Sequence, residues 1–207
     1  MNSISSLRTG AAWPRAFAMF CVVLALFGQG VARAAEIVIG QVAPLTGVLA
    51  SSGEQMVLGG KIYFDAVNAQ GGVHGATLHQ LVVDDGYDVS KTVARTSGLL
   101  ARPDVVAWFG FAGTANITQL LKDGVLADGG AALVAPYTGG ESLRSPFNPW
   151  IFHVRAGYVD EAEHMVQQLT TLNMNRIAVM YQDDGFGQSG LEGVEAALAR
   201  RKLKLAA

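Results

Sequence analysis

Residues 36–85 read EIVIGQVAPLTGVLASSGEQMVLGGKIYFDAVNAQGGVHGATLHQLVVDD, and this stretch decides the fold class. It begins with a β-branched run at 36–42 that predicts a strand, which ends before Pro44 because proline cannot continue a strand ladder. Apolar residues at three-to-four spacing then predict a helix over 53–68, ended by a pair of glycines. The apolar run at 78–83 predicts a second strand. The stretch therefore has the order strand, helix, strand.

The same alternation continues along the chain. We expect a helix over 88–101, a strand over 105–109, a helix over 114–127 and a strand over 131–135. Strands that are continuous apolar runs and alternate with helices favour a parallel sheet covered on both faces. The expected fold class is therefore α/β, with a three-layer lobe built on a parallel sheet.

Ligands of such sheets bind at the carboxyl ends of the strands, in the loops that lead to helices. Three loops occupy these places, at Thr46–Gly53, Phe111–Thr114 and Tyr137–Gly140. A helix that starts at Thr114 offers free N–H donors and the positive end of its dipole, which suit a carboxylate. These loops are the candidate binding site.

After the Pro- and Gly-rich segment 136–149 the alternation restarts. An extended piece at 150–155 is followed by an expected helix at 160–172, a strand at 176–181 and a helix at 187–201. We divide the chain into a first lobe at residues 35–149 and the beginning of a second, similar lobe at residues 150–207. The second lobe has too few strands to close a sheet, so we expect a truncated reading frame or a fragment.

Residues 1–34 have the three parts of a secretory signal peptide. Arg8 and Arg15 precede an apolar run at 16–27, and Ala32-Arg33-Ala34 offers the small residues that a signal peptidase needs. The apolar run is shorter than the roughly 20 residues of a membrane span. We therefore expect cleavage after Ala34 and a periplasmic mature protein.

Composition excludes some classes of partner. Without residues 1–34 the chain loses three of its 15 basic residues and none of its 17 acidic residues, so its formal net charge falls from −2 to −5. An acidic chain of this kind lacks the basic patch that nucleic-acid binding requires. The single cysteine lies within residues 1–34, so no disulfide is expected in the mature protein.

Several strings are familiar from one family. They are PLTG at 44–47, NAQGGVHG at 68–75, FGFAGTAN at 109–116, APYTGGESLR at 135–144 and VMYQDDGFGQSG at 179–190. In this order the chain resembles the leucine/isoleucine/valine-type (branched-chain amino acid) substrate-binding proteins of ABC transporters, which have the type I periplasmic binding fold. The resemblance covers the expected mature chain and about the first half of a family member.

The resemblance implies two α/β lobes joined by a hinge, with a solute enclosed between them and handed to a membrane permease. It implies that Thr114 and Thr138 hold the α-carboxylate of an amino acid, with Gly113 and Tyr137 in the same two loops. Ser52 matches a position that lines the same cleft.

From the second lobe, Phe186 takes the place of a Tyr that covers the ligand in the family, which suggests a more apolar contact. Tyr158 is expected to supply an aromatic wall. The acidic residue that receives an amino group in the family would follow Ala207, so the solute stays open between an amino acid and another small organic acid.

Two other interpretations compete with solute binding. The hexapeptide Gly185–Gly190 fits G-x-G-x-x-G after an expected strand, as in dinucleotide sites, but Asp183 and Asp184 would repel a pyrophosphate. Position 205, where an acid should hold the ribose, is Leu205. Catalysis and metal binding are also disfavoured. Ser189 is not in G-x-S-x-G, and His74, His79, Asp84 and Asp85 match no metal-ligand spacing.

We therefore expect a non-catalytic, extracytoplasmic solute-binding protein of an ABC importer, with no cofactor and no metal. The alternative is a ligand-sensing receptor or regulator domain of the same fold.

Overall fold

The computed structural model describes residues 35–207, which form one compact unit. The signal peptide predicted at 1–34 lies outside the described residues. Five strands make one parallel sheet in the order β2-β1-β3-β4-β5. Their bounds are Glu36–Ala43 for β1, Thr77–Asp84 for β2, Val105–Phe109 for β3, Leu133–Val134 for β4 and Ile151–Phe152 for β5.

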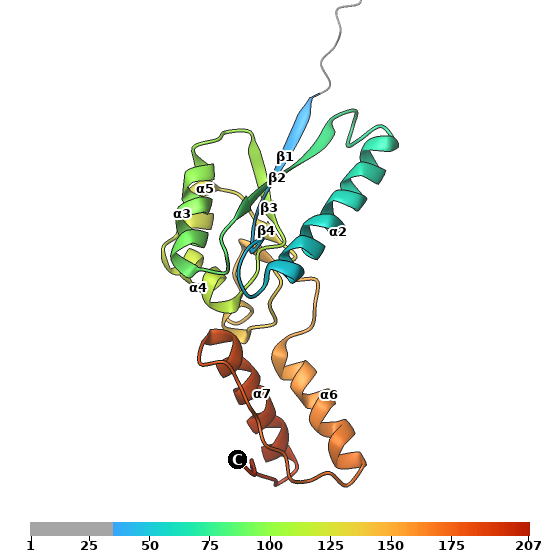
Figure 1. Cartoon of the computed structure of the whole chain (residues 1–207), viewed down its shortest axis with the longest axis vertical. Helices are drawn as coiled ribbons and strands as arrows, with labels where there is room; N and C mark the ends of the chain where they lie inside the picture. Colours follow the sequence, from blue (N-terminus) through green and yellow to red (C-terminus); the bar gives the residue numbers. More distant parts are fainter. Residues whose placement is uncertain (1–34) are drawn as a thin grey trace, which may run out of the picture. The chain divides into compact units, whose positions relative to one another are not determined.

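Helices cover both faces of this sheet, as Figure 1 shows. Helix α2 (Ala50–Ala69) lies on one face, and α3 (Val89–Leu100), α4 (Thr114–Lys122) and α5 (Val125–Gly129) lie on the other. The three-layer α/β lobe with a parallel sheet is confirmed. The single helix expected over 114–127 is instead α4 and α5, because Gly124 takes a left-handed backbone (φ 71°) between them.

The main core lies between the sheet and the α3–α5 layer. Trp108 at the end of β3 is fully buried, and its ring meets that of Phe111 edge-on at 5.8 Å. Ile117 and Leu120 from α4 and Leu133 from β4 complete the same cluster. Burial of such side chains contributes roughly 1.5–3 kcal/mol each. This packing fixes the carboxyl ends of β3 and β4, and with them the loops that follow.

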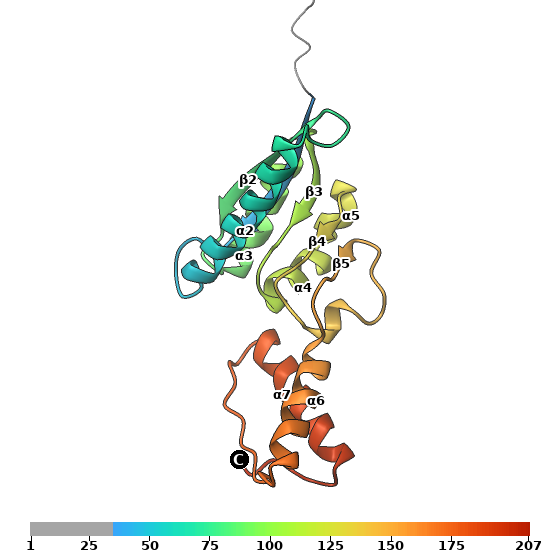
Figure 2. The ribbon, with the colours of Figure 1, turned by 90° about the vertical axis from the view of Figure 1, so that its right-hand side faces the viewer.

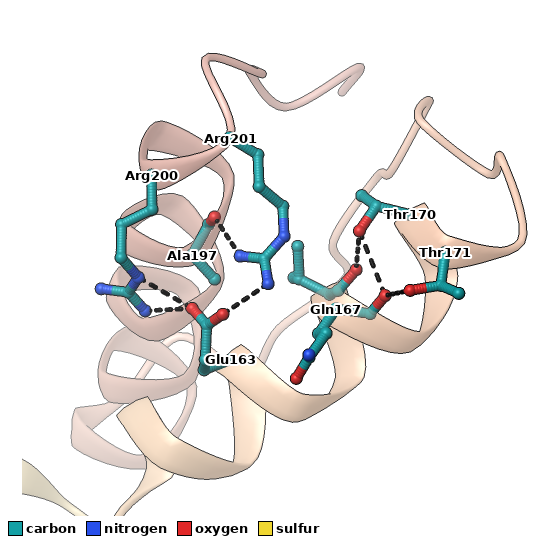
Figure 3. A network of polar contacts seen from close by, with 8 residues as sticks. Glu163, Gln167, Thr170, Thr171, Ala197, Arg200 and Arg201 are labelled. Carbon is teal, nitrogen blue, oxygen red and sulfur yellow. Dashed lines mark hydrogen bonds and ion pairs between the residues drawn. The ribbon is translucent and has the colours of Figure 1, made fainter.

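Two further helices follow a one-turn 3-10 helix at Glu141–Leu143. Helices α6 (Tyr158–Thr171) and α7 (Gly185–Arg200) pack against each other along the chain's last part (Figure 2), with Val166 and Leu198 buried between them. Glu163 on α6 accepts hydrogen bonds from Arg200 and Arg201 at the end of α7 (Figure 3). We refer to α6 and α7 as the helical pair.

Two sequence expectations differ from the observed structure. The extended piece expected at 150–155 contains β5, which adds to the first sheet next to β4. The strand expected over Arg176–Tyr181 does not form: two hydrogen bonds, from Val179 N to Ala207 O (3.2 Å) and from Ala206 N to Ile177 O (2.8 Å), are too few for a ladder. The lobe boundary near residue 149 stays a prediction. Within 35–207, no helix combines the length and apolar character needed to cross a membrane.

Candidate functional site

A cavity of about 530 Å³ opens between the carboxyl edge of the sheet and the first turns of the helical pair. Six of the seven predicted site residues line it: Ser52, Gly113, Thr114, Tyr137, Tyr158 and Phe186. Val48 and Leu49, from the predicted loop Thr46–Gly53, also line it. Four lining residues were not predicted from the sequence: Tyr87, Arg155, Glu161 and Gln182. The loops predicted at the carboxyl ends of the strands therefore converge on one cavity.

Thr114 forms the polar floor of this cavity, and Thr138 supports it from behind. The hydroxyls of Thr114 and Thr138 lie 2.7 Å apart, and both side chains are buried. Thr138 Oγ1 also accepts from Gly140 N at 3.1 Å, so Thr138 stands behind Thr114 rather than at the cavity surface. Either hydroxyl can be the donor in this contact. When Thr138 donates, the Thr114 hydrogen stays available on the cavity side, where it suits an oxyanion.

Thr114 begins α4, whose first turn faces the same floor. Its N-cap is Gly113 (φ 97°, ψ 127°), and no side chain caps the helix. A Cβ at Gly113 would lie 2.8 Å from the Tyr87 ring and 2.3 Å from Asn116 Oδ1, so only glycine fits here. The uncapped amides and the positive end of the helix dipole add to the threonine hydroxyls as donors for an anion.

The Asp84 carboxylate ties two cavity loops together. Its Oδ1 accepts from Leu45 N at 2.7 Å and from Gly86 N at 2.9 Å, and its Oδ2 accepts from the Thr46 hydroxyl at 2.7 Å. The Thr46 hydrogen bond is the main cause that lowers the pKa of Asp84 to about 2, with the backbone amides adding to it. Asp84 thereby holds the loop after β1 against the turn after β2.

The neighbouring Asp85 is buried and holds the next part of the framework. Its Oδ1 accepts from Tyr87 N at 2.9 Å, and its Oδ2 accepts from the Thr92 hydroxyl at 2.6 Å. Asn116 Nδ2 in turn donates to Thr92 Oγ1 at 2.8 Å. Burial raises the pKa of Asp85, opposed by the Thr92 hydrogen bond. This network links the turn after β2 to α3 and to the first turn of α4.

Arg155 supplies a cation to the cavity wall. Its guanidinium lies 5.7 Å from the Tyr137 ring centre and 5.3 Å from that of Tyr158, and it pairs with the Glu161 carboxylate. Burial lowers the pKa of Arg155, but the hydrogen bond and the charge of Glu161 outweigh it, so the pKa lies above its usual value. Arg155 lies in the segment between β5 and α6, which we call the crossover. Through Arg155 and Glu161, the crossover contacts both tyrosines.

Phe186 and Tyr158 form the aromatic part of the wall contributed by the helical pair. Their rings meet edge-on with centres 5.4 Å apart. A Cβ at Gly139 would lie 2.6 Å from the Tyr158 ring, so the loop after β4 makes room for this tyrosine. Ser52 lies in the first turn of α2, where it is half-buried at the cavity edge.

The G-x-G-x-x-G segment does not present free amides to a phosphate. Asp184 is the N-cap of α7, and its Oδ1 accepts from Phe186 N at 2.9 Å and from Gly187 N at 3.0 Å. A carboxylate of the chain itself thus occupies the place that a pyrophosphate takes in a dinucleotide site. Among residues 35–207, no three His, Cys, Asp or Glu side chains gather closely enough to hold a metal ion.

Some of the missed residues left a signal in the sequence. Tyr87 follows the carboxyl end of β2, and the rule that ligands bind at strand ends applies to this turn as it does to the three loops named. Arg155 and Glu161 left none, because a single charged residue on either side of a helix start is ordinary. Only the packed crossover brings their side chains to the cavity.

Residues 36–207 match the family described as periplasmic binding protein. This chain belongs to that family. Its members are substrate-binding proteins, which confirms the prediction that the chain is not an enzyme.

Individual relatives place the chain within this family. A substrate-binding periplasmic protein of known structure from Ralstonia solanacearum is 34% identical (TM-score 0.78), with 82% of this chain and 47% of that one covered. An extracellular ligand-binding receptor from Verminephrobacter eiseniae is 32% identical (TM-score 0.77), with 83% and 48% covered.

A curated relative, the Leu/Ile/Val-binding protein homolog 3 of Brucella melitensis, is 25% identical over 84% of this chain and 47% of its own length. This periplasmic binding protein chain therefore spans about half the length of the curated relatives it matches. The resemblance to the leucine/isoleucine/valine-type proteins is confirmed.

Proposed function

We propose that this chain is the solute-binding component of an ABC importer and that it binds an amino acid or a related small carboxylate in the cavity at the sheet edge. The observation that carries the proposal is the Thr114–Thr138 hydroxyl pair beneath the uncapped N-terminus of α4. Hydroxyl and amide donors that converge on one point fit a carboxylate, since each donates to an acceptor-only group.

The second support is the composition of the cavity wall. Residues of the sheet loops and residues of the helical pair line the same space, so a ligand there touches both. A ligand that contacts both sides favours the state in which they are close together, which is hinge closure by population shift. A membrane permease that recognises this closed state is the partner we propose. Export by cleavage after Ala34 and a periplasmic location fit this role.

The relatives support the same assignment. One is named a Leu/Ile/Val-binding protein homolog, and another an amino acid binding protein from Pseudomonas aeruginosa. A branched-chain or other amino acid is therefore the first ligand class to try, with small organic acids as the second.

Thermal unfolding of the purified chain with a panel of amino acids and small organic acids tests the proposal. A ligand at a hundredfold excess over its dissociation constant stabilises the folded state by about 2.7 kcal/mol. We expect at least one class of ligand to raise the melting temperature of the wild type. This rise should be lost in Thr114→Val, which keeps the shape of the side chain and removes the hydroxyl.

The matched control is Thr171→Val, an exposed threonine near the end of α6 whose hydroxyl donates to Gln167 O. This variant should keep the ligand-induced shift. A cooperative melt that no member of the panel moves, or a shift that Thr114→Val retains in full, contradicts the proposed site.

A further inference from the structure

Tyr87 adopts a backbone conformation that residues with a β-carbon rarely take. Its φ is +65°, in the left-handed region, directly after Gly86 at φ +59°. Such a conformation is unfavourable for a bulky aromatic residue and persists only where the surroundings impose it. The hydrogen bond from Tyr87 N to the buried Asp85 carboxylate, which Thr92 holds in place, imposes it here. Glycine would fit this backbone without strain, so the phenol ring calls for an explanation.

The ring of Tyr87 faces the cavity. It is half-buried and lies against Gly113, whose missing side chain leaves the space that the ring occupies. Gln182, from the loop before α7, lines the same cavity, and burial raises the pKa of the Tyr87 phenol. The strained turn after β2 thus aims an aromatic ring from the sheet side toward the helical pair.

Aromatic rings line the cavity on the other side as well. Tyr158 and Phe186 stand edge to face at 5.4 Å, and Tyr158 fits against Gly139 as Tyr87 fits against Gly113. Ring faces and edges make geometry-specific contacts with another ring beyond what buried area provides. A branched alkyl group gains only the burial of its area.

We propose that Tyr87 is a specificity-determining residue which, with Tyr158 and Phe186, selects a carboxylate with a planar aromatic body over a branched-chain amino acid. This inference rests on the proposed function, because the carboxylate of the ligand is held at Thr114. Tyr87 acts on the body of the ligand and not on its charged end.

Titration calorimetry of the purified chain with benzoate, phenylacetate, leucine and valine tests the selection. We expect at least one aromatic acid to bind tenfold or more tightly than either amino acid. Tyr87→Gly removes the ring and relieves the left-handed strain, so the variant should fold. Its affinity for the aromatic acid should fall at least tenfold, and its affinity for leucine should fall by a clearly smaller factor, because an alkyl group loses only buried area.

His74→Gly is the matched control. His74 is an exposed non-glycine residue at φ +52° and does not line the cavity, so its replacement relieves the same kind of strain without touching the site. We expect no change in affinity for either class. If Tyr87→Gly does not melt cooperatively, Phe186→Leu on the opposite wall provides the test instead. It should lower the ratio of the affinity for the aromatic acid to the affinity for leucine.

Three results overturn the inference. Leucine or valine binding as tightly as the aromatic acids, or equal losses for both classes in Tyr87→Gly, leaves the proposed function standing and removes the selection by Tyr87. Full retention of the aromatic preference in both Tyr87→Gly and Phe186→Leu also removes the selection by Tyr87 and leaves the proposed function standing. A folded wild-type chain that binds none of the four compounds and none of the wider panel contradicts the proposed function as well.

Discussion

Gly113 shows how much of the cavity depends on a single residue. It caps α4 without a side chain, leaves room for the Tyr87 ring and takes a φ of +97°. Gly113 was expected in the site because the resemblance placed it in the loop beside Thr114. The structure supplies a physical reason for glycine here, which is the space taken by Tyr87 from another loop.

Gly113→Ala should therefore destabilise the chain more than the same substitution at a glycine of similar φ with open space around it. Left-handed strain costs roughly 1–2 kcal/mol, and the overlap with Tyr87 and Asn116 should add about 1–3 kcal/mol. Urea unfolding measures both. The matched control is Gly71→Ala, at φ +99° with open space around the position, which should show the strain cost alone. Equal losses of unfolding free energy in the two variants would mean that the overlap with Tyr87 and Asn116 does not affect stability.

At the scale of elements, periodicity predicted most of the fold. The helices α2, α3, α6 and α7 and the strands β1 to β3 lie within a few residues of their predicted places. Two differences have local causes: Gly124 divides the helix after Thr114, and the segment 176–181 lacks a strand ladder. The pair Asp84–Asp85, which matched no metal-ligand spacing, forms the framework of two cavity loops. The partners of Asp84 in the loop after β1 lie 38 and 39 positions earlier in the chain, which no local pattern reveals.

The turn after β2 should make stability depend on pH. The pKa of Asp84 is depressed to about 2 in the folded state from an ordinary value of 3.8. A depressed carboxyl pKa contributes stability that is fully present above pH 3.8 and is lost as the pH falls through about 2. Asp84→Asn should therefore be less stable than the wild type at neutral pH and show a shallower loss of stability between pH 4 and 2. Unfolding free energies from urea titrations at several pH values measure the slope.

The control for this change is Asp65→Asn, which removes an exposed carboxylate on α2 that pairs with Lys61 and lies away from the cavity. In this variant the unfolding free energy should still fall between pH 4 and 2, because Asp84 is unchanged. An unchanged slope in Asp84→Asn would show that the hydrogen bonds from the loop after β1 do not stabilise the ionised form.

On the scale of the whole described unit, the cavity exists only where the sheet loops and the helical pair meet. Thr114 and Tyr87 come from the sheet side, and Tyr158, Glu161 and Phe186 come from the helical pair. Arg155 lies in the crossover and contacts rings from both sides through Tyr137 and Tyr158. A ligand in this cavity therefore couples two parts of the chain that share few other contacts.

Hydrogen exchange should reveal this coupling. A stabilising ligand should slow amide exchange at the same time in the loops 44–53 and 110–116 and in the segment 182–188. The reason is that local opening of either side releases the ligand. Segments remote from the cavity, such as the turn at 70–76, serve as an internal control. Protection of the sheet loops alone would contradict a site shared with the helical pair.

The sequence by itself determined the α/β class, the order of elements, the family and the loops that carry Thr114 and Thr138. These depend on local periodicity, on turn residues and on strings that can be recognised one by one. The tertiary structure decided that Tyr87, Arg155 and Glu161 belong to the cavity. Their positions depend on side-chain contacts that no periodicity or turn pattern shows: the Asp85–Thr92 hydrogen bond that holds a left-handed turn, and the crossover that sets a guanidinium near two rings.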